Sequence, residues 1–404
     1  MLPCCVGYLK RNNKMMNKEQ NIFPFIERLL DGAEVEWKKL GEVAELKRGK
    51  RVTKDALSSN KKYPVYSGGV KPMGYYDEYN QEADTITIVK YGTAGYVNFI
   101  TERFWANDVC YCVKPKDNLD KRYLFYYLKN VQLYINSLAT DAIPAHLPLP
   151  SLVSILIPLP PLSVQEEIVR ILDKFTTLEA ELEAELDCRK RQYEYYRNNL
   201  LSYEGNEVEW KTLGEVGEIR MCKRILKEQT SDYGEVPFYK IGTFGKEADA
   251  YISKELFNEY RAKYNYPNVG DILISASGTI GRTVIFDGKE AYFQDSNIVW
   301  IENDQKKVLN KYLFYYYQIA KWNISEGGTI LRLYNENLRK TLIPIPYPNN
   351  PKKSLEEQNR IVAILDKFDT LVNSISEGLP KEIALRRKQY EYYREKLLTF
   401  INNQ

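Results

Sequence analysis

Histidine is almost absent from this sequence. Among 404 residues there is one, His146. Nucleophilic catalysis by serine or cysteine commonly needs a histidine as its general base. His146 stands in a stretch of prolines and leucines, where we expect a structural role. A catalytic triad or dyad of that kind is therefore not predicted.

Several motifs of catalysis and cofactor binding are missing too. The chain has no Gly-x-x-x-x-Gly-Lys-Ser/Thr phosphate loop and no Gly-x-Gly-x-x-Gly segment after a strand. It also lacks the Asn/Asp-Pro-Pro-Tyr/Phe tetrapeptide with which amino-methyltransferases hold the base that they modify. We therefore expect a binding protein that is not catalytic and holds no cofactor or metal of its own.

Long apolar runs and paired cysteine motifs are absent as well. No run approaches the roughly 18 apolar residues of a transmembrane helix, so we predict a cytoplasmic protein with no membrane partner. The six cysteines form no C-x-x-C pair. They are expected to be reduced thiols rather than a disulfide framework or a zinc site.

Charge and aromatic content set a further limit. The formal net charge is only +3, so a surface that binds nucleic acid would have to be a local patch. Tyrosine is abundant, with 33 residues against 14 phenylalanines. Tyrosine combines apolar area with a polar tip, which suits both half-buried strands and wet interfaces.

Two long segments of the chain repeat each other. Both carry Leu-Asp-Lys-Phe, at 172–175 and 365–368. Both then carry Gln-Tyr-Glu-Tyr-Tyr-Arg, at 192–197 and 389–394. Matches of this length indicate an internal duplication.

Each repeated segment has the spacing of an amphipathic helix. Apolar residues of the first copy step by three and four, as in Ile168, Leu172 and Phe175. Ser163 and Glu166 fit a capping box at its start, and Pro380 predicts a kink or break in the second copy. Each apolar stripe needs a partner along its length, and the other copy is the obvious candidate.

The chain outside these helices is duplicated as well. A strand followed by Leu-Gly-Glu-Val, a Gly-Thr-x-Gly turn between strands, a Tyr-Leu-Phe-Tyr-Tyr helix and an Ile-Pro-x-Pro strand recur in order. Between these motifs the two copies diverge. The sequence thus predicts variable segments in a repeated frame. The motifs lie at 37–43 and 210–216, 92–95 and 278–281, 123–127 and 312–316, and 157–160 and 343–346.

One signal suggests a nuclease. Glu36-x-Lys38 and Glu209-x-Lys211 resemble the end of a metal-dependent nuclease motif. The upstream acid would be Asp31, which is too close in sequence for the usual two-strand arrangement, and the second copy has no matching Asp. We interpret Val-Glu-Trp-Lys as plain strand alternation instead.

Together these motifs resemble the specificity subunit of type I restriction–modification systems, over nearly everything from Phe23 to Phe400. The resemblance implies an α+β fold, with two pseudo-symmetric α/β target recognition domains separated by two long antiparallel helices in a coiled-coil-like spacer. It implies domains at 21–162 and 204–353 and helices at 163–203 and 354–400. Residues 1–20 would be a disordered or mis-started tail. The Glu-Ala-Glu-Leu repeat at 179–182 and 183–186 agrees, because family members carry tetrapeptide repeats in this spacer.

The resemblance also implies a function. Each recognition domain would read one half of a split DNA sequence, and the chain would be the non-catalytic subunit of a type I adenine methyltransferase and ATP-dependent endonuclease complex. Its partners would be double-stranded DNA, two modification (methyltransferase) subunits and, where the system cuts DNA, restriction subunits. S-adenosylmethionine, ATP and Mg²⁺ would be bound by those partner subunits.

Basic clusters and Gly-, Ser-, Thr- and Tyr-rich loops are the candidate DNA-binding residues, because they suit phosphate and base-edge contacts. A solvated face remains the alternative for the clusters, and a purely structural role for the turns. In the first copy the candidates are Lys47, Arg48, Lys50, Arg51, Ser67, Gly68, Gly69, Lys71, Tyr75, Tyr91, Gly92 and Thr93. In the second copy they are Arg220, Lys223, Arg224, Tyr239, Lys240, Thr243, Ser275, Ser277, Thr279 and Arg282.

The apolar residues of the helices are the candidate spacer and subunit interface. They are Leu172, Phe175, Leu182, Tyr193, Tyr196, Leu365, Phe368, Tyr390 and Tyr393. Two alternatives stay open at this point. A coiled-coil scaffold or adhesin would bind no DNA, and an autonomous nuclease would cut DNA by itself with a metal.

Overall fold

The computed structural model describes residues 23–203, 207–322, 324 and 332–401, so the predicted tail at 1–20 lies outside the described residues. The chain divides into two units. Unit 1 consists of Met1–Glu183 and Ile383–Gln404, and unit 2 of Ala184–Glu382. Each unit therefore contains one globular domain and parts of the long helices.

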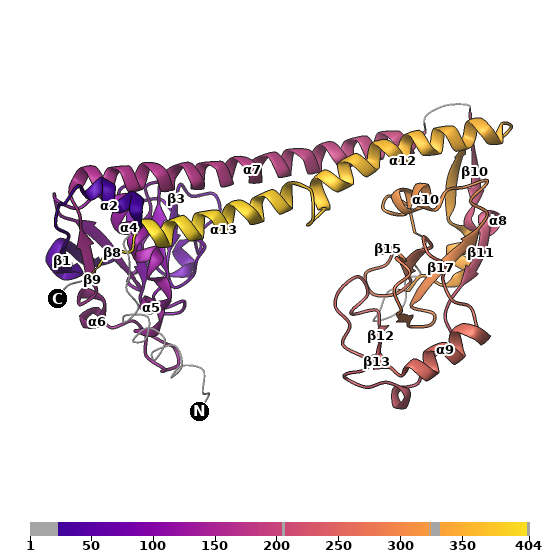
Figure 1. The fold of residues 1–404 in the computed structure, drawn as a ribbon, viewed down its shortest axis with the longest axis horizontal. Coiled ribbons are helices and arrows are strands. Elements are labelled where there is room, and N and C mark those ends of the chain that lie inside the picture. Colours follow the sequence, from indigo (N-terminus) through magenta and orange to yellow (C-terminus); the bar gives the residue numbers. More distant parts are fainter. Residues whose placement is uncertain (1–22, 204–206, 323, 325–331, 402–404) are drawn as a thin grey trace. The chain divides into compact units, whose positions relative to one another are not determined.

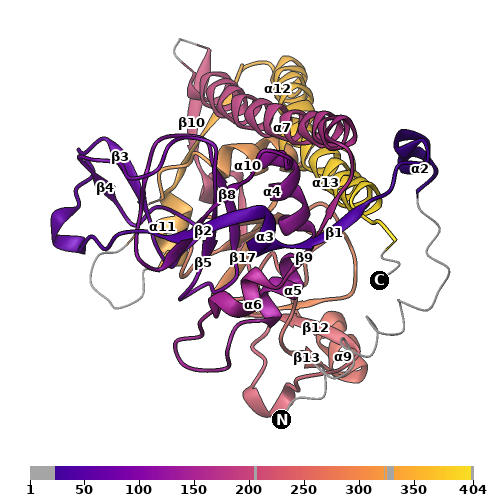
Figure 2. The same cartoon turned by 90° about the vertical axis from the view of Figure 1, so that its left-hand side faces the viewer.

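Unit 1 is built on two sheets (Figure 1). The larger has the order β2–β8–β5–β6, and the smaller has the order β4–β3–β7. In Figure 2 the small sheet lies at one side of this unit and helix α2 (Pro24–Leu30) at the other. The strands are β2 (Ala44–Arg48), β3 (Tyr63–Tyr66), β4 (Tyr75–Tyr76), β5 (Thr85–Val89), β6 (Val97–Ile100), β7 (Trp105–Ala106) and β8 (Cys110–Pro115).

Unit 2 repeats this topology strand for strand. Its four-stranded sheet has the order β11–β17–β14–β15 and its three-stranded sheet the order β13–β12–β16. Helix α9 (Lys254–Lys263) is inserted between β13 and β14, which contributes to the greater length of this unit. The strands are β11 (Gly217–Arg220), β12 (Val236–Tyr239), β13 (Tyr251–Ile252), β14 (Ile272–Ser275), β15 (Thr283–Ile285), β16 (Tyr292–Phe293) and β17 (Ile298–Asn303).

A separate strand pair closes each domain. In unit 1, β1 (Glu36–Lys39) pairs antiparallel with β9 (Leu156–Leu159), which is the predicted Ile-Pro-x-Pro strand. In unit 2, β10 (Val208–Thr212) pairs with β18 (Leu342–Pro346). Glu36 and Lys38 form an ion pair with each other within β1, at 2.7 Å. The strand interpretation of the nuclease-like motif is confirmed.

The Leu-Gly-Glu-Val motif is a single helical turn with its own cap. Glu42 accepts a hydrogen bond from the backbone N–H of Lys39 at 2.9 Å, at the start of α3 (Leu40–Val43). Glu215 does the same for Thr212 at 2.7 Å, at the start of α8 (Leu213–Val216). The glutamate satisfies a donor that the first turn leaves free, which explains its place in both copies.

The first long helix is continuous and the second is not. Helix α7 spans Leu162–Ser202. Ser163 therefore lies inside the helix, and the prediction that it is the N-cap is wrong. The second copy consists of α12 (Pro351–Asn373) and α13 (Leu379–Leu397), so the break predicted near Pro380 is confirmed and lies at residues 374–378. Pro380 lies in the first turn of α13, where a missing N–H breaks no helical bond.

The two copies pack on each other inside each unit. In unit 1, α13 lies beside the first part of α7 (Figure 1), and Phe175 stacks on Tyr393 with ring centroids 5.4 Å apart. In unit 2, Phe368 stacks on Tyr196 at 5.3 Å, and the two interplanar angles are both 25°. Leu-Asp-Lys-Phe of each copy therefore meets Gln-Tyr-Glu-Tyr-Tyr-Arg of the other, as the stripe pattern predicts.

Buried tyrosines anchor each domain to its helix. The Tyr126 hydroxyl of α4 (Lys121–Asn130) donates to Asp173 of α7 at 2.6 Å. The equivalent Tyr315 of α10 (Asn310–Tyr317) donates to Asp366 of α12 at 2.6 Å. These helices contain the predicted Tyr-Leu-Phe-Tyr-Tyr segments. The remaining helices are α5 (Gln132–Ser137), α6 (Leu149–Val153) and α11 (Asn335–Lys340).

Because these tyrosines are buried, we expect the folded protein to lose stability at alkaline pH. Burial, with the bond to Asp173, raises the pKa of Tyr126 from 10 to about 12. Stability is then fully present below pH 10 and is lost as the pH rises toward 12, because the unfolded chain releases a proton that the folded chain retains. We expect the urea midpoint to fall between pH 10 and 12 in wild type and to fall less steeply in Tyr126→Phe. An equal slope in Tyr126→Phe would contradict this reading.

Within 23–203, 207–322 and 332–401 we find no helix with the length and apolar character that a membrane crossing requires. The same ranges contain no grouping of three or more His, Cys, Asp or Glu side chains suited to a metal ion. Cys110, Cys112, Cys188 and Cys222 are free thiols.

Candidate nucleic-acid interface

Loops from separate strands meet at one edge of unit 1. We call this the reading edge of unit 1 and define it by residues 49–52, 66–69, 90–95 and 106–110. Backbone bonds join these segments. Lys50 N–H donates to the Ala106 carbonyl at 2.9 Å, and Asn107 N–H donates to the Tyr66 carbonyl at 2.9 Å. Each segment lies where a strand ends or begins, so the sheets fix its position.

The Gly-Thr-x-Gly turn locks two of these loops together. Thr93 donates to the Gly68 carbonyl from both its N–H and its hydroxyl, at 2.9 and 3.0 Å. Gly92 has a φ of +88°, and a Cβ on it would lie 2.5 Å from the Gly68 oxygen. Only glycine fits there. The tight turn that the sequence predicts is confirmed, and Thr93 remains exposed on it.

The basic cluster of unit 1 extends along β2 into this edge. Arg48 donates from Nε and Nη2 to the Asp108 carbonyl, at 3.2 and 3.1 Å. Lys47 is paired with Glu45 at 2.8 Å. Lys50 and Arg51 are exposed in the loop after the strand. Lys71 and Tyr75 lie on the β3–β4 hairpin, and both are exposed.

Two residues that support this edge, His146 and Cys110, are not among the predicted DNA contacts. Tyr91 stacks on His146 with ring centroids 5.6 Å apart, and the backbones of the two residues form an isolated bridge. His146 also contacts the Thr140 hydroxyl through Nδ1 at 2.9 Å. The single histidine therefore has a structural role, as predicted, and it holds Tyr91 of the reading edge in place. Burial raises the pKa of Cys110 to about 12, and its thiol donates to the Ser67 carbonyl.

The reading edge of unit 2 consists of residues 221–224, 239–243, 275–282 and 294–297. Gln294 N–H donates to the Tyr239 carbonyl at 3.0 Å, in the place of the Asn107–Tyr66 bond. Gly278 and Gly281 have φ values of +66° and +79°, so the turn recurs as predicted. Thr279 at its tip is exposed.

Two of the predicted DNA contacts in unit 2 lie inside the protein. Ser275 is 1% exposed, and its hydroxyl accepts from the Arg282 N–H at 2.9 Å and donates to the Thr279 carbonyl. Ser277 is 4% exposed and donates to Asn297 Oδ1 at 2.8 Å. Both hydroxyls build the turn, so the prediction that they contact base edges is wrong in this structure.

Other predicted residues of unit 2 also have internal partners. Arg282 Nη1 donates to the Phe244 carbonyl at 3.0 Å. The Thr243 hydroxyl accepts from the Lys240 N–H at 3.2 Å. Arg220 forms ion pairs with Glu218 and Glu302, at 2.7 and 2.6 Å. Their contacts with DNA stay predictions.

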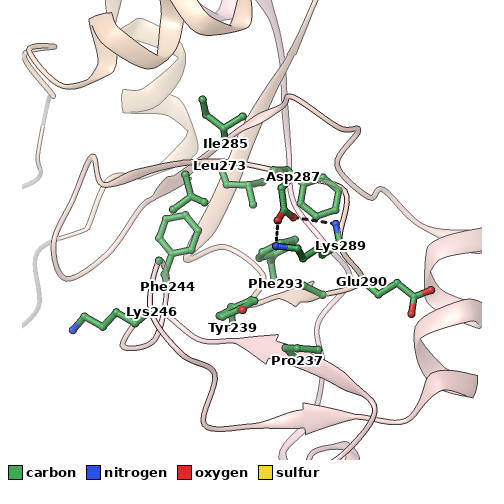
Figure 3. A pocket seen from close by; sticks show the side chains of 14 residues that line it. Pro237, Tyr239, Phe244, Lys246, Leu273, Ile285, Asp287, Lys289, Glu290 and Phe293 are labelled. Atoms are coloured by element: carbon green, nitrogen blue, oxygen red, sulfur yellow. Dashed lines mark hydrogen bonds and ion pairs between the residues drawn. The ribbon is translucent and has the colours of Figure 1, made fainter. Parts of the chain in front are cut away.

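Tyr239 and Lys240 point into different hollows, as successive strand residues do. Tyr239 lines an apolar pocket of about 310 Å³ together with Phe244 and Phe293 (Figure 3). Its ring stacks on Phe293 at 5.9 Å. Lys240 lines a polar hollow of about 610 Å³. A contact of Tyr239 with DNA stays a prediction.

A comparison with protein families decides the identity of this arrangement. The model for the type I restriction modification DNA specificity domain matches residues 33–187 and again 206–385. The chain belongs to this family. It is a type I restriction–modification specificity subunit with two such regions.

Curated relatives agree with this assignment. A putative type I restriction enzyme specificity subunit of Haemophilus influenzae is 53% identical, over 93% of this chain and 98% of its own length. The EcoR124I/EcoR124II specificity subunit of Escherichia coli is 33% identical, over 93% and 97%. The crystal structure of the S subunit from M. genitalium has a TM-score of 0.58 at 18% identity, over 92% and 98%. That last likeness concerns the fold alone.

Some of the helical residues predicted to form the spacer interface are buried within their units, and others are partly exposed. Leu172, Leu365 and Tyr193 are buried within their own units, at 0%, 0% and 5% exposed. Leu182 is half-buried. Each Gln-Tyr-Glu-Tyr-Tyr-Arg segment also keeps an exposed tyrosine, Tyr195 or Tyr392, in edge contact with the stacked one. The specificity subunit thus has two matching aromatic clusters: Tyr195, Tyr196 and Phe368 in unit 2, and Tyr392, Tyr393 and Phe175 in unit 1.

Proposed function

We propose that this specificity subunit recognises a split DNA target, with one reading edge for each half. The observation that carries the proposal is a strand frame that is repeated in both units with different residues at its edges. Asn107 of unit 1 and Gln294 of unit 2 donate through equivalent backbone bonds, yet the side chains around them differ. Equal scaffolds with unequal edges suit a protein that reads two different sequences in one manner.

We further propose that the chain is non-catalytic and docks two methyltransferase subunits. The two aromatic clusters support this, because they repeat with nearly the same geometry and remain partly exposed. Half-exposed tyrosines are typical of protein interfaces. S-adenosylmethionine would then be bound by the methyltransferase subunits, and ATP and Mg²⁺ by restriction subunits in systems that cut DNA.

The alternatives of a DNA-free scaffold and an autonomous nuclease are not favoured, because relatives at 53% and 33% identity are named as specificity subunits. A methyl-transfer assay tests the proposal. The methyltransferase subunit with this chain should methylate adenines in specific sites, and neither component alone should do so. Sequence-independent methylation by the methyltransferase subunit alone would contradict it, and so would metal-dependent cutting by the isolated chain.

A further inference from the structure

The polar hollow of unit 2 contains a braced arginine. Arg224 Nε donates to the Asp295 carboxylate at 3.0 Å. The Asp295 side chain is 18% exposed, whereas the Arg224 side chain is 67% exposed. The carboxylate therefore lies in the wall, and the guanidinium reaches outward over it. A bond through Nε occupies one side of the planar guanidinium and leaves its outer end, with one N–H from each terminal nitrogen, free to donate.

The hollow combines both charges. Lys240 and Arg332 line it together with Arg224, and Asp249 is paired with Lys240 at 2.9 Å. Gln294 and Asn297 add amide groups. A phosphate placed there would meet the carboxylates of Asp232, Asp249 and Asp295 beside the cations. A base edge with acceptors and donors suits this mixture better, because each group of the hollow can find an opposite partner.

Unit 1 uses the same position differently. Asp108 occupies the place of Asp295, one residue after the backbone donor of the reading edge. Arg48, which stands three residues before Arg51, the counterpart of Arg224, donates there to the Asp108 backbone carbonyl through both Nε and Nη2. Both bonds come from the same side of the Arg48 guanidinium, and they anchor this side chain to the main chain. The bracing by a carboxylate is a feature of unit 2.

We propose that Arg224, held by Asp295, reads a guanine in the half-site of unit 2. This inference rests on the proposed function and names the base that this edge recognises. An arginine whose fork is already oriented can donate two bonds to guanine O6 and N7 in the major groove. The brace lowers the entropy that such a contact loses. Arg224 is then a specificity-determining residue and Asp295 a positioning residue.

The neighbouring Lys223 supplies a matched control. Its ammonium lies over the Tyr264 ring, 5.2 Å from the centroid, and it lines a different hollow with Met221 and Cys222. Lys223 is exposed, and no carboxylate of the residues that the structure describes braces it in this way. It suits a phosphate contact, which contributes affinity without sequence preference.

Base-analogue binding tests the inference. The complex of this chain with its methyltransferase subunit is titrated with duplexes of its mapped target, each with one guanine replaced by 7-deazaguanine, which lacks the N7 acceptor. Wild type should lose about ten-fold in affinity at one guanine of the unit 2 half-site. Arg224→Ala and Arg224→Lys should lose this sensitivity and accept other base pairs there. Asp295→Asn should weaken the preference at the same guanine.

The result expected for the control variant differs from the results that would overturn the inference. Lys223→Ala should weaken binding to all sequences alike, lower the salt slope by about one and keep the guanine sensitivity. Equal weakening by Arg224→Ala at every sequence would overturn the inference, and so would a unit 2 half-site without guanine. An unchanged preference in the unit 1 half-site verifies that each variant is folded. A complex with no sequence preference would instead refute the proposed function.

Discussion

One additional Glu-Ala-Glu-Leu tetrapeptide after Leu186 should widen the gap between the two half-sites by one or two base pairs. Four residues lengthen a helix by about 6 Å and add a rotation of about 40°. B-DNA rises about 3.4 Å per base pair. The insertion point preserves the unit 1 contacts, because Glu179 and Glu183 before it pair with Arg387. It also lies before the Tyr193 and Tyr196 contacts with Phe368 in unit 2.

We expect the second helical copy to take up the added length at its break, residues 374–378 between α12 and α13. Mapping of methylated adenines in the variant measures the gap. Glu181→Gln, which changes the same tetrapeptide at constant length, should leave the gap unchanged. An unchanged gap in the insertion variant would show that α7 does not set the distance between half-sites.

Gly92→Val should abolish recognition of one half-site. A valine at a φ of +88° is strained, and its Cβ would overlap the Gly68 carbonyl that Thr93 binds. Backbone strain of this kind costs about 1–3 kcal/mol, and the overlap adds to it. We therefore expect a lower unfolding midpoint and the loss of unit 1 sequence preference, measured by denaturation and by binding to scrambled half-sites.

Gly69→Ala is the control for this turn. Gly69 stands on the same loop, and a Cβ there would meet only the Lys71 carbonyl at 3.8 Å. We expect stability close to that of wild type, which separates the strain at Gly92 from any contact of this loop with DNA. If Gly92→Val kept both half-sites at wild-type affinity, the turn would not position the reading edge.

The repeated frame could be predicted from the sequence because its motifs are local and appear twice. The strand alternation at Trp37, the Gly92 turn and the tyrosine helix of Tyr126 each follow from short-range chemistry that one segment contains. Duplication then identified the partner of each helix. The break near Pro380 also follows from a local rule, although the sequence indicated one long helix around it.

The reading edges could be predicted only in part, because long-range pairing creates them. Ser275 is of a residue type that often contacts base edges. Its hydroxyl, however, forms hydrogen bonds with the backbone of Arg282 and Thr279 within the turn. Asp295 and Asn107 stand in divergent loops without a motif. Their importance appears only when the sheet places them beside Arg224 and Tyr66. One signal was available: Asn107 and Gln294 each follow equivalent strands of the two copies, and Asp108 and Asp295 come directly after them.

Methylation mapping of the whole complex tests the two-edge organisation most directly. Genomic DNA is mapped for methylated adenines with this chain and its methyltransferase subunit present, and again with this chain absent. We predict two short specified sequences separated by unspecified base pairs of fixed number, and no such sites without the chain. A single uninterrupted motif would contradict the proposal that two separate edges read the target.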